Sequence, residues 1–135
     1  MTRAYLDSNM VIAIVEDGPP GAAYMREWLR QHVGPAGAVV VSDLVRVECR
    51  VKPLRTGDTS LLADYDRYFA QSDVGVARLT PSVCDRAAEI RAHERRSLAD
   101  ALHLAAAIEA GCDVFVTADQ RLRGFAGLPV VVLSP

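Results

Sequence analysis

Four acidic residues lie where short apolar segments end or where helices begin, and their types and spacing could support chemistry. They are Asp7, Glu48, Asp100 and Asp119. Asp7 and Asp119 closely follow apolar segments, while Glu48 lies on a helix expected after a third such segment. Asp100 is the lone acid in the nearly continuous apolar stretch 98–107, where a carboxylate is costly unless its charge is compensated.

Carboxylates that converge in one cleft repel one another and are stable as anions only with cations between them. Hard divalent ions such as Mg²⁺ and Mn²⁺ prefer such oxygen ligands, and one or two of them can polarise a phosphodiester and activate a water. Each acid alone also has an ordinary explanation. Asp7 and Asp119 could cap turns, and Asp100 could favour a helix dipole. Glu48 could pair with Lys52 one turn along its helix. The set of four is more specific than any single member.

The elements that must position these acids alternate between short strands and helices. Apolar segments predict strands over residues 3–6, 38–41, 74–79, 114–116 and 130–133. Helical spacing predicts helices over 9–16, 22–32, 59–70 and 98–110, two more that begin near 43 and 81, and a short turn or helix at 118–122. This alternation predicts an α/β fold, a three-layer α/β/α sandwich with a mainly parallel sheet of about five strands. In such sheets, ligands bind beyond the carboxyl ends of the strands.

Capping residues mark several of the expected helix ends. Ser97 is expected to cap the helix that begins at residue 98, and Gly111 to close it. Ser42 or Asp43 is expected to cap the helix that carries Glu48. Pro53 should disturb or end that helix, because proline has no backbone N–H to donate.

Length and composition narrow the possible classes of protein. The chain of 135 residues, with 50% hydrophobic and 24% charged residues, predicts a single globular domain over residues 1–135. No apolar run approaches the roughly 20 residues of a membrane span, and no secretory signal is evident, so we expect a cytoplasmic protein. A net charge of −2 argues against nucleic-acid binding by bulk positive charge. The three widely spaced cysteines are expected to be buried free thiols.

The sequence resembles the PIN-domain family, and within it the VapC-type toxins. The matching stretches are Tyr-Leu-Asp-Ser-Asn at 5–9, residues 42–48, Asp-Ala-Leu-His-Leu-Ala at 100–105, and Thr-Ala-Asp at 117–119. These stretches extend from the first expected strand to near the last, so the resemblance covers essentially the whole chain.

The resemblance implies a metal-dependent endoribonuclease, the toxin of a type II toxin–antitoxin pair. It implies that Asp7, Glu48, Asp100 and Asp119 hold Mg²⁺ or Mn²⁺, and that one of them also accepts a proton from water. By the same resemblance, Asn9 and Thr117 support these acids by hydrogen bonding. The expected partners are an RNA substrate and a VapB-type antitoxin protein. Such toxins commonly form homodimers, and the helices around Trp28 and Tyr65 are the candidate surfaces.

Two further sets of residues have open interpretations. Arg46, Arg50 and Arg55 lie near Glu48 and could contact RNA phosphates, or they could form ordinary surface salt bridges. His103 follows Asp100 by three residues and so shares its helix face. It could be a metal ligand, but we favour a partly buried, hydrogen-bonded histidine.

Two other functions remain open on sequence alone. A phosphohydrolase could use Asp7 as a covalent nucleophile, but that class requires a second Asp two residues later, where this chain has Asn9, and a supporting lysine. Lys52 is the only lysine. Alternatively, the acids could bind metal only to stabilise a non-catalytic interaction protein. Asp7→Asn would then lower the melting temperature without abolishing an activity.

Overall fold

A five-stranded parallel sheet organises the chain in the computed structural model, which describes residues 1–16 and 21–133. The strand order is β3-β2-β1-β4-β5, and every neighbouring pair is parallel. The strands are β1 Arg3–Leu6, β2 Ala38–Ser42, β3 Val74–Ala77, β4 Val114–Thr117 and β5 Val130–Val132. The predicted parallel sheet of about five strands is therefore confirmed.

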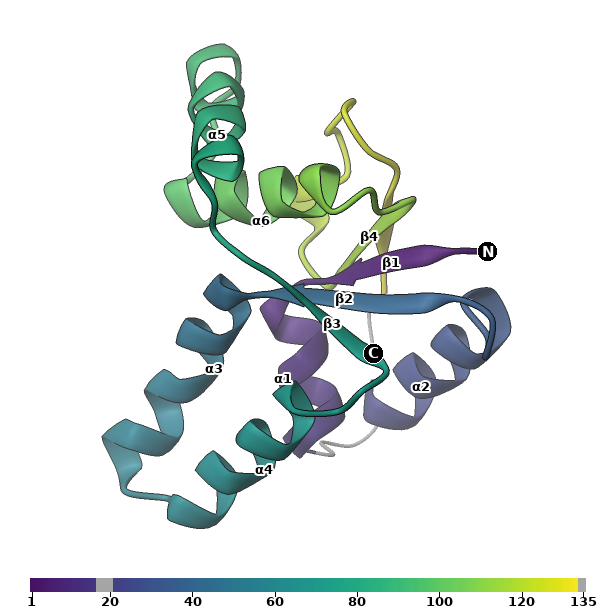
Figure 1. The fold of residues 1–135 in the computed structure, drawn as a ribbon, viewed down its shortest axis with the longest axis vertical. Helices are drawn as coiled ribbons and strands as arrows, with labels where there is room; N and C mark the ends of the chain where they lie inside the picture. The colour runs from purple at the N-terminus through teal and green to yellow at the C-terminus, as the bar shows by residue number, and fades with distance from the viewer. Residues whose placement is uncertain (17–20, 134–135) are drawn as a thin grey trace.

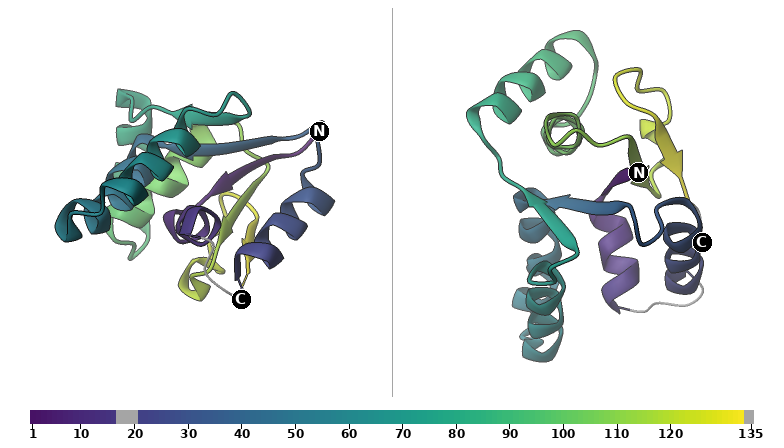
Figure 2. Two further views of the ribbon diagram at one scale, coloured as in Figure 1. Left: turned by 90° about the horizontal axis from the view of Figure 1, so that it is seen from below. Right: turned by 45° about the vertical axis from the view of Figure 1, so that its right-hand side comes forward.

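Helices cover both faces of this sheet (Figures 1 and 2). They are α1 Ser8–Glu16, α2 Gly21–His32, α3 Asp43–Thr56, α4 Thr59–Phe69, α5 Pro81–His93 and α6 Leu98–Glu109, with a short 3-10 helix at Gln120–Leu122. Helices α1 to α4 lie on one side of the sheet, while α6 packs on the other side and α5 packs against α6. Among the described residues, no helix combines the length and apolar character that a membrane span requires.

The core forms around the central strand β1, which pairs with β2 on one side and β4 on the other. Tyr5 and Phe115 are fully buried and stack with ring centroids 5.1 Å apart. Because β1, β2 and β4 are adjacent and parallel, their carboxyl ends meet at one edge. Any residue that directly follows these three strands is therefore brought to the same place.

Pro53 does not end its helix, contrary to one of the two expected outcomes. It lies inside α3, is buried, and is followed by three more helical residues. The helix ends instead at Gly57, which has a φ of 70° and donates its backbone N–H to the Pro53 carbonyl. A left-handed residue after the last turn favours glycine, which explains why Gly57 rather than the proline sets the end.

The expectation that all three cysteines are buried is wrong. Cys49 and Cys112 are buried free thiols as expected, but Cys84 is exposed on α5. Tyr65 of α4 is fully buried and its hydroxyl donates to Glu16, so its own side chain lies in the core. Dimer formation through the helices around Trp28 and Tyr65 stays a prediction.

Gly37, in the turn before β2, is closely surrounded by backbone atoms. A Cβ atom at Gly37 would lie 2.4 Å from the Val33 carbonyl oxygen and 2.6 Å from that of Thr2. Gly37→Ala should therefore lower the free energy of unfolding by about 1–3 kcal/mol, measured by urea denaturation. Gly124→Ala is the matched control, because a Cβ there meets nothing within 4 Å. Equal effects of the two substitutions would contradict the packing argument.

Candidate active site

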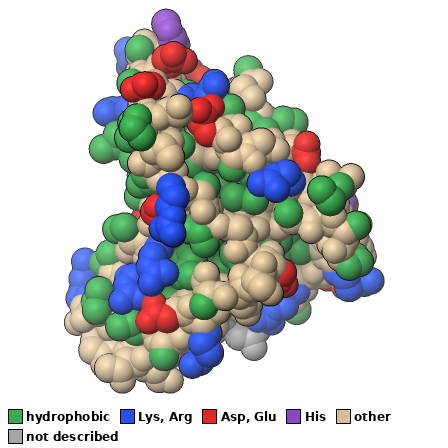
Figure 3. Space-filling model, in the orientation of Figure 1, with side chains coloured by type: hydrophobic (Ala, Val, Ile, Leu, Met, Phe, Trp, Pro, Cys, Tyr) green, Lys and Arg blue, Asp and Glu red, His purple; other side chains and the backbone are tan. Residues whose placement is uncertain are grey.

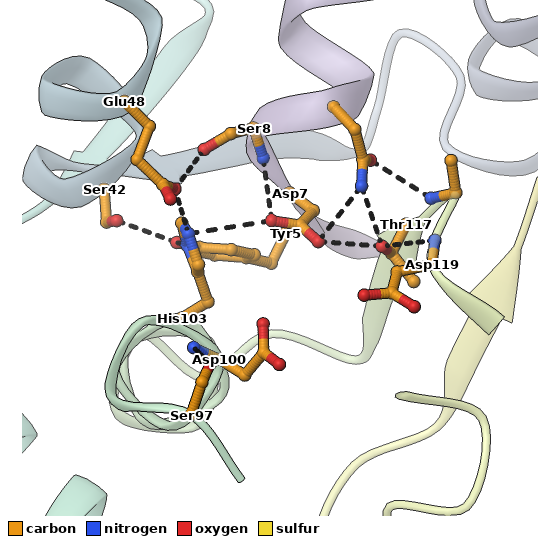
Figure 4. A network of polar contacts seen from close by, with 12 residues as sticks. Tyr5, Asp7, Ser8, Ser42, Glu48, Ser97, Asp100, His103, Thr117 and Asp119 are labelled. Carbon is orange, nitrogen blue, oxygen red and sulfur yellow. Dashed lines mark hydrogen bonds and ion pairs between the residues drawn. The ribbon is translucent and has the colours of Figure 1, made fainter. Parts of the chain in front are cut away.

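The carboxyl ends of β1 and β4, together with α3, bring three of the predicted acids to one edge of the sheet (Figure 4). Asp7 directly follows β1, and its backbone N–H donates to the Val116 carbonyl at 3.0 Å, which extends the pairing with β4. Asp119 follows β4 by two residues, and Glu48 lies on α3, which begins where β2 ends. Asp100 comes from the first turn of α6 on the other side of the cleft.

Asp7 is the most buried of the four acids, with 8% of its surface exposed. Its Oδ1 accepts the Ser8 backbone N–H at 2.8 Å, and its Oδ2 accepts the Thr117 hydroxyl at 2.7 Å. Burial nevertheless raises the pKa of the Asp7 carboxyl above its usual range, and the nearby charge of Glu48 raises it further. The hydrogen bonds therefore compensate this buried charge only in part.

Asn9 and Thr117 form hydrogen bonds with Asp7 and with each other. The Asn9 amide nitrogen donates to Thr117 Oγ1 at 3.3 Å and to Asp7 Oδ2 at 3.4 Å. Its amide oxygen accepts the Ala118 backbone N–H at 3.1 Å. Thr117 Oγ1 in turn accepts the Asp119 backbone N–H at 3.0 Å. These contacts join the start of α1 to the end of β4 and orient Asp7.

Glu48 is held beside Asp7 by two donors. Its Oε1 accepts the Ser8 hydroxyl at 2.6 Å and lies 2.5 Å from His103 Nε2. The hydrogen bond with His103 is the main reason why the pKa of the Glu48 carboxyl is lowered. Lys52, considered above as a partner for Glu48, instead forms an ion pair with Glu16 at 2.7 Å. The ordinary surface pairing is therefore not formed.

His103 is hydrogen-bonded, as the favoured interpretation predicted, but it is buried rather than partly buried. Its Nε2 also lies 3.6 Å from Asp7 Oδ1, so the imidazole borders both carboxylates. Ligand atoms of Asp7, Glu48 and His103 all lie within 4.8 Å of one another.

Asp119 and Asp100 form the more open side of the site. Arg121 binds both carboxyl oxygens of Asp119, with Nη2 at 2.6 Å from Oδ2, and these hydrogen bonds lower the pKa of Asp119. The carboxyl group of Asp100 makes no hydrogen bond or ion pair with any described residue. It points into the space that the Asp7 and Asp119 carboxyl groups also face (Figure 4). Its charge contributes to the raised pKa of Arg121, so the two groups interact electrostatically.

Sequence reasoning assigned no role at the site to three residues that complete it, namely Tyr5, Ser8 and Ser42. Ser8 begins α1, and its hydroxyl binds Glu48. Ser42 is the N-cap residue of α3 but makes no capping hydrogen bond with its side chain, and its Oγ lies 2.7 Å from the Tyr5 hydroxyl. Tyr5 lies on β1, two residues before Asp7, which directly follows that strand.

The three arginines near Glu48 differ in their surroundings. Arg46 and Arg50 both form ion pairs with Asp66 of α4, and the Arg46 guanidinium lies over the Phe69 ring. Arg55 is exposed in the last turn of α3. Figure 3 shows arginine and lysine side chains scattered over one face, with acidic side chains among them. RNA contact by these arginines remains a prediction.

The donor atoms of this site suit a hard divalent cation. Apart from the His103 imidazole, the groups that border the shared space are carboxylate oxygens, which Mg²⁺ and Mn²⁺ prefer. The buried and incompletely compensated charge of Asp7 is a further reason why a cation would be stabilised there.

The raised pKa of Asp7 predicts a pH dependence in EDTA. The folded protein binds the Asp7 proton more tightly than the unfolded chain does, so this contribution to stability is lost as pH rises through the raised pKa. The Asp7→Asn variant has no carboxyl group to lose this proton. Its free energy of unfolding should therefore rise relative to that of the wild type as pH increases above the ordinary Asp pKa of about 4, measured by urea denaturation. Asp85→Asn, on the exposed side of α5, is the control for loss of a surface carboxylate. A pH-independent difference between Asp7→Asn and the wild type would contradict the burial argument.

Comparisons with known proteins match this fold throughout its length. A chain of the VapBC2 complex from Rickettsia felis, solved with promoter DNA, superposes with a TM-score of 0.77 at 14% identity, covering 97% of this chain and 98% of that one. A chain of DNA-bound VapBC from Salmonella typhimurium gives 0.77 at 17% identity, with 98% of each chain covered. VapC20 of Mycobacterium tuberculosis, a toxin that cleaves the Sarcin-Ricin loop, gives 0.67 at 20% identity, covering 93% of this chain and 98% of that one.

The sequence also matches the model of a protein family, apart from the structural likeness. No curated protein matches the sequence closely enough to count as a relative. The PIN domain model, however, matches residues 4–128, which include all four acids. The chain therefore belongs to the PIN domain family.

Proposed function

We propose that this protein is a metal-dependent endoribonuclease, the toxin of a type II toxin–antitoxin pair. The observation that carries the proposal is the group of Asp7, Glu48 and His103 at the carboxyl edge of a PIN-domain sheet, whose ligand atoms all lie within 4.8 Å of one another, with the Asp100 and Asp119 carboxyl groups facing the same space. VapC20, which shares this fold, is described as a toxin that cleaves the Sarcin-Ricin loop. That likeness supports RNA as the class of substrate.

In this proposal, Asp7, Glu48, Asp100 and Asp119 hold Mg²⁺ or Mn²⁺. Such an ion, when bound, polarises the phosphodiester and acidifies a water. Asp7 is held rigidly by Ser8 and Thr117, so its position is preorganised. Asp100 is the acid best placed to accept the proton of the attacking water, because its carboxyl group has no other hydrogen-bond partner among the described residues.

The contacts around Asp7 and Lys52 favour this function over a phosphohydrolase that uses Asp7 as a nucleophile. The amide of Asn9 is occupied by Thr117 and Ala118, so it does not replace the second Asp of that class. Lys52 is paired with Glu16 and supplies no cation to Asp7. A trapped aspartyl-phosphate on Asp7 would nevertheless establish the alternative.

We also propose that an antitoxin protein of VapB type is the partner, and that the toxin forms a homodimer. Support for the antitoxin comes from the matched structures, several of which are VapBC or toxin–antitoxin complexes. Beside the helices around Trp28 and Tyr65, a further apolar surface for partners is formed by Val47, Val51 and Leu54, which are exposed at helical spacing on α3.

Cleavage of total cellular RNA tests the proposed activity. Wild-type protein should produce discrete fragments with Mg²⁺ or Mn²⁺ and none with EDTA. Asp7→Asn and Asp100→Asn should each reduce the rate by at least about 100-fold, because loss of a direct ligand should cost more than loss of an outer hydrogen-bond partner.

Asp85→Asn is the matched control for this experiment, since it removes an exposed carboxylate of α5. It should cleave at the wild-type rate. Absence of cleavage by wild type under every condition, with metal stabilising wild type and variants equally, would overturn the four-acid site and favour the interaction protein.

The salt dependence of RNA binding tests the contribution of Arg55. If its guanidinium contacts a phosphate, Arg55→Gln should reduce the slope of log K against log salt concentration by about 0.7, the value for one contact with a single strand. The measurement is a fluorescence-anisotropy titration of an RNA oligonucleotide with EDTA present. Arg123→Gln, an exposed control beyond the 3-10 helix, should leave the slope unchanged. An unchanged slope for Arg55→Gln would exclude that contact.

A further inference from the structure

We propose that His103 is a positioning residue that presents Glu48 to the divalent ion, and that Tyr5 and Ser42 hold His103 in place for this role. The inference rests on the proposed nuclease function and deepens it. It assigns a role to a buried hydrogen-bond network, formed by Ser42, Tyr5 and His103, that extends behind the acidic site (Figure 4). The proposed reaction itself does not use this network.

The hydrogen-bond network begins at the end of β2 and reaches the acidic site through three buried side chains. Ser42 Oγ lies 2.7 Å from the Tyr5 hydroxyl, which in turn lies 2.7 Å from His103 Nδ1. On the other side of the ring, His103 Nε2 lies 2.5 Å from Glu48 Oε1. Ser42 and Tyr5 are fully buried, and 3% of the His103 side chain is exposed.

The groups around His103 determine which atom donates and which accepts in each hydrogen bond of this network. Nε2 faces carboxylate oxygens of Glu48 and Asp7, which can only accept when ionised, so Nε2 must carry the proton. Nδ1 is then the acceptor nitrogen of the neutral ring, and the Tyr5 hydroxyl can donate to it. The Tyr5 oxygen can then accept the Ser42 hydroxyl proton. Every polar side-chain atom of this network has a partner in this arrangement, which fixes the imidazole ring in one orientation.

The contacts of His103 determine which Glu48 oxygen is available. The Ser8 hydroxyl and His103 Nε2 both bind Oε1. Among the described residues, none forms a hydrogen bond with Oε2, so that oxygen is left for a cation. Glu48 lies on the solvent-exposed side of α3, where 37% of its side-chain surface is accessible. Without these donors, its flexible side chain would lose conformational freedom each time a metal bound.

The contacts also distinguish this role from direct metal ligation by His103. Nε2 is the ring nitrogen that faces the acids, and it is used as a donor to Glu48. Nδ1 is turned away toward Tyr5. Neither nitrogen therefore offers a lone pair to an ion in the shared space.

Titration of the purified protein with Mn²⁺, followed by calorimetry, tests the proposal. His103→Leu removes the N–H group while keeping an apolar side chain in the core, and should raise the Kd for Mn²⁺ by about 10–100-fold. His103→Gln retains an N–H donor at a comparable distance from the backbone and should restore most of the affinity. Tyr5→Phe, which keeps the ring that stacks on Phe115, should raise the Kd less and in the same direction. His93→Leu, exposed at the end of α5, should match wild type.

Nuclease kinetics provide the second readout. With His103→Leu, cleavage should be slow at low Mn²⁺ and recover at saturating Mn²⁺, while the KM for RNA stays unchanged. A purely structural role would instead lower the thermal stability of the metal-free protein without this recovery. Circular dichroism of each metal-free variant measures that stability, and Tyr5→Phe decides the question if His103→Leu does not fold.

Three results would overturn the proposal. An unchanged or lower Kd in His103→Leu would show that the imidazole does not help to present Glu48. Equal losses in the Gln and Leu variants would mean that the N–H group is not what matters, as expected if His103 were itself a ligand. Failure of the wild-type protein to bind Mn²⁺ would remove the proposed metal-dependent function and this inference together. The first two results leave the proposed function intact.

Discussion

The buried carboxylate of Asp7 is the constraint on which the rest of the site depends. A charge with so little access to water must be compensated by nearby donors or by a cation. The donors come from Ser8 at the start of α1, and from Thr117 at the end of β4, itself bound by Asn9. The same contacts that compensate the charge therefore join two elements that are 110 residues apart in the sequence. Their compensation is incomplete, because the pKa of Asp7 stays raised.

The two sides of the site differ in how they are supported. On one side, Glu48 is tied to Ser8 and to a buried imidazole, so its position is determined by the core. On the other side, Asp119 is bound by the exposed Arg121, and the carboxyl group of Asp100 faces open space. Exposed ion pairs are weak and easily exchanged. The Asp100 and Asp119 side is therefore the less constrained one, while the Asp7 and Glu48 side is held in place.

Most of the fold was predictable from local pattern, whereas burial was predictable only in part. The strands and helices follow from apolar periodicity, and Ser97 caps α6 as expected, with its hydroxyl accepting the Asp100 backbone N–H at 3.1 Å. Pro53 and Cys84 show what local sequence pattern does not predict. Whether a proline ends a helix, or a cysteine is covered, depends on the packing of neighbouring elements, which a local pattern does not contain.

The sequence by itself determined the alternation of strands and helices, the positions of the four acids and, through its motifs, the resemblance to PIN domains. It could do so because these features depend on residue type and spacing along the chain. Only the tertiary structure decided that Glu48 is bound to His103 rather than to Lys52, that Tyr5 and Ser42 support the imidazole, and that Arg121 binds Asp119. Such partners are chosen by the parallel order of β2, β1 and β4 and by the packing of α3 and α6 at their edge. Those relations join residues that are distant in sequence, so no local pattern could specify them.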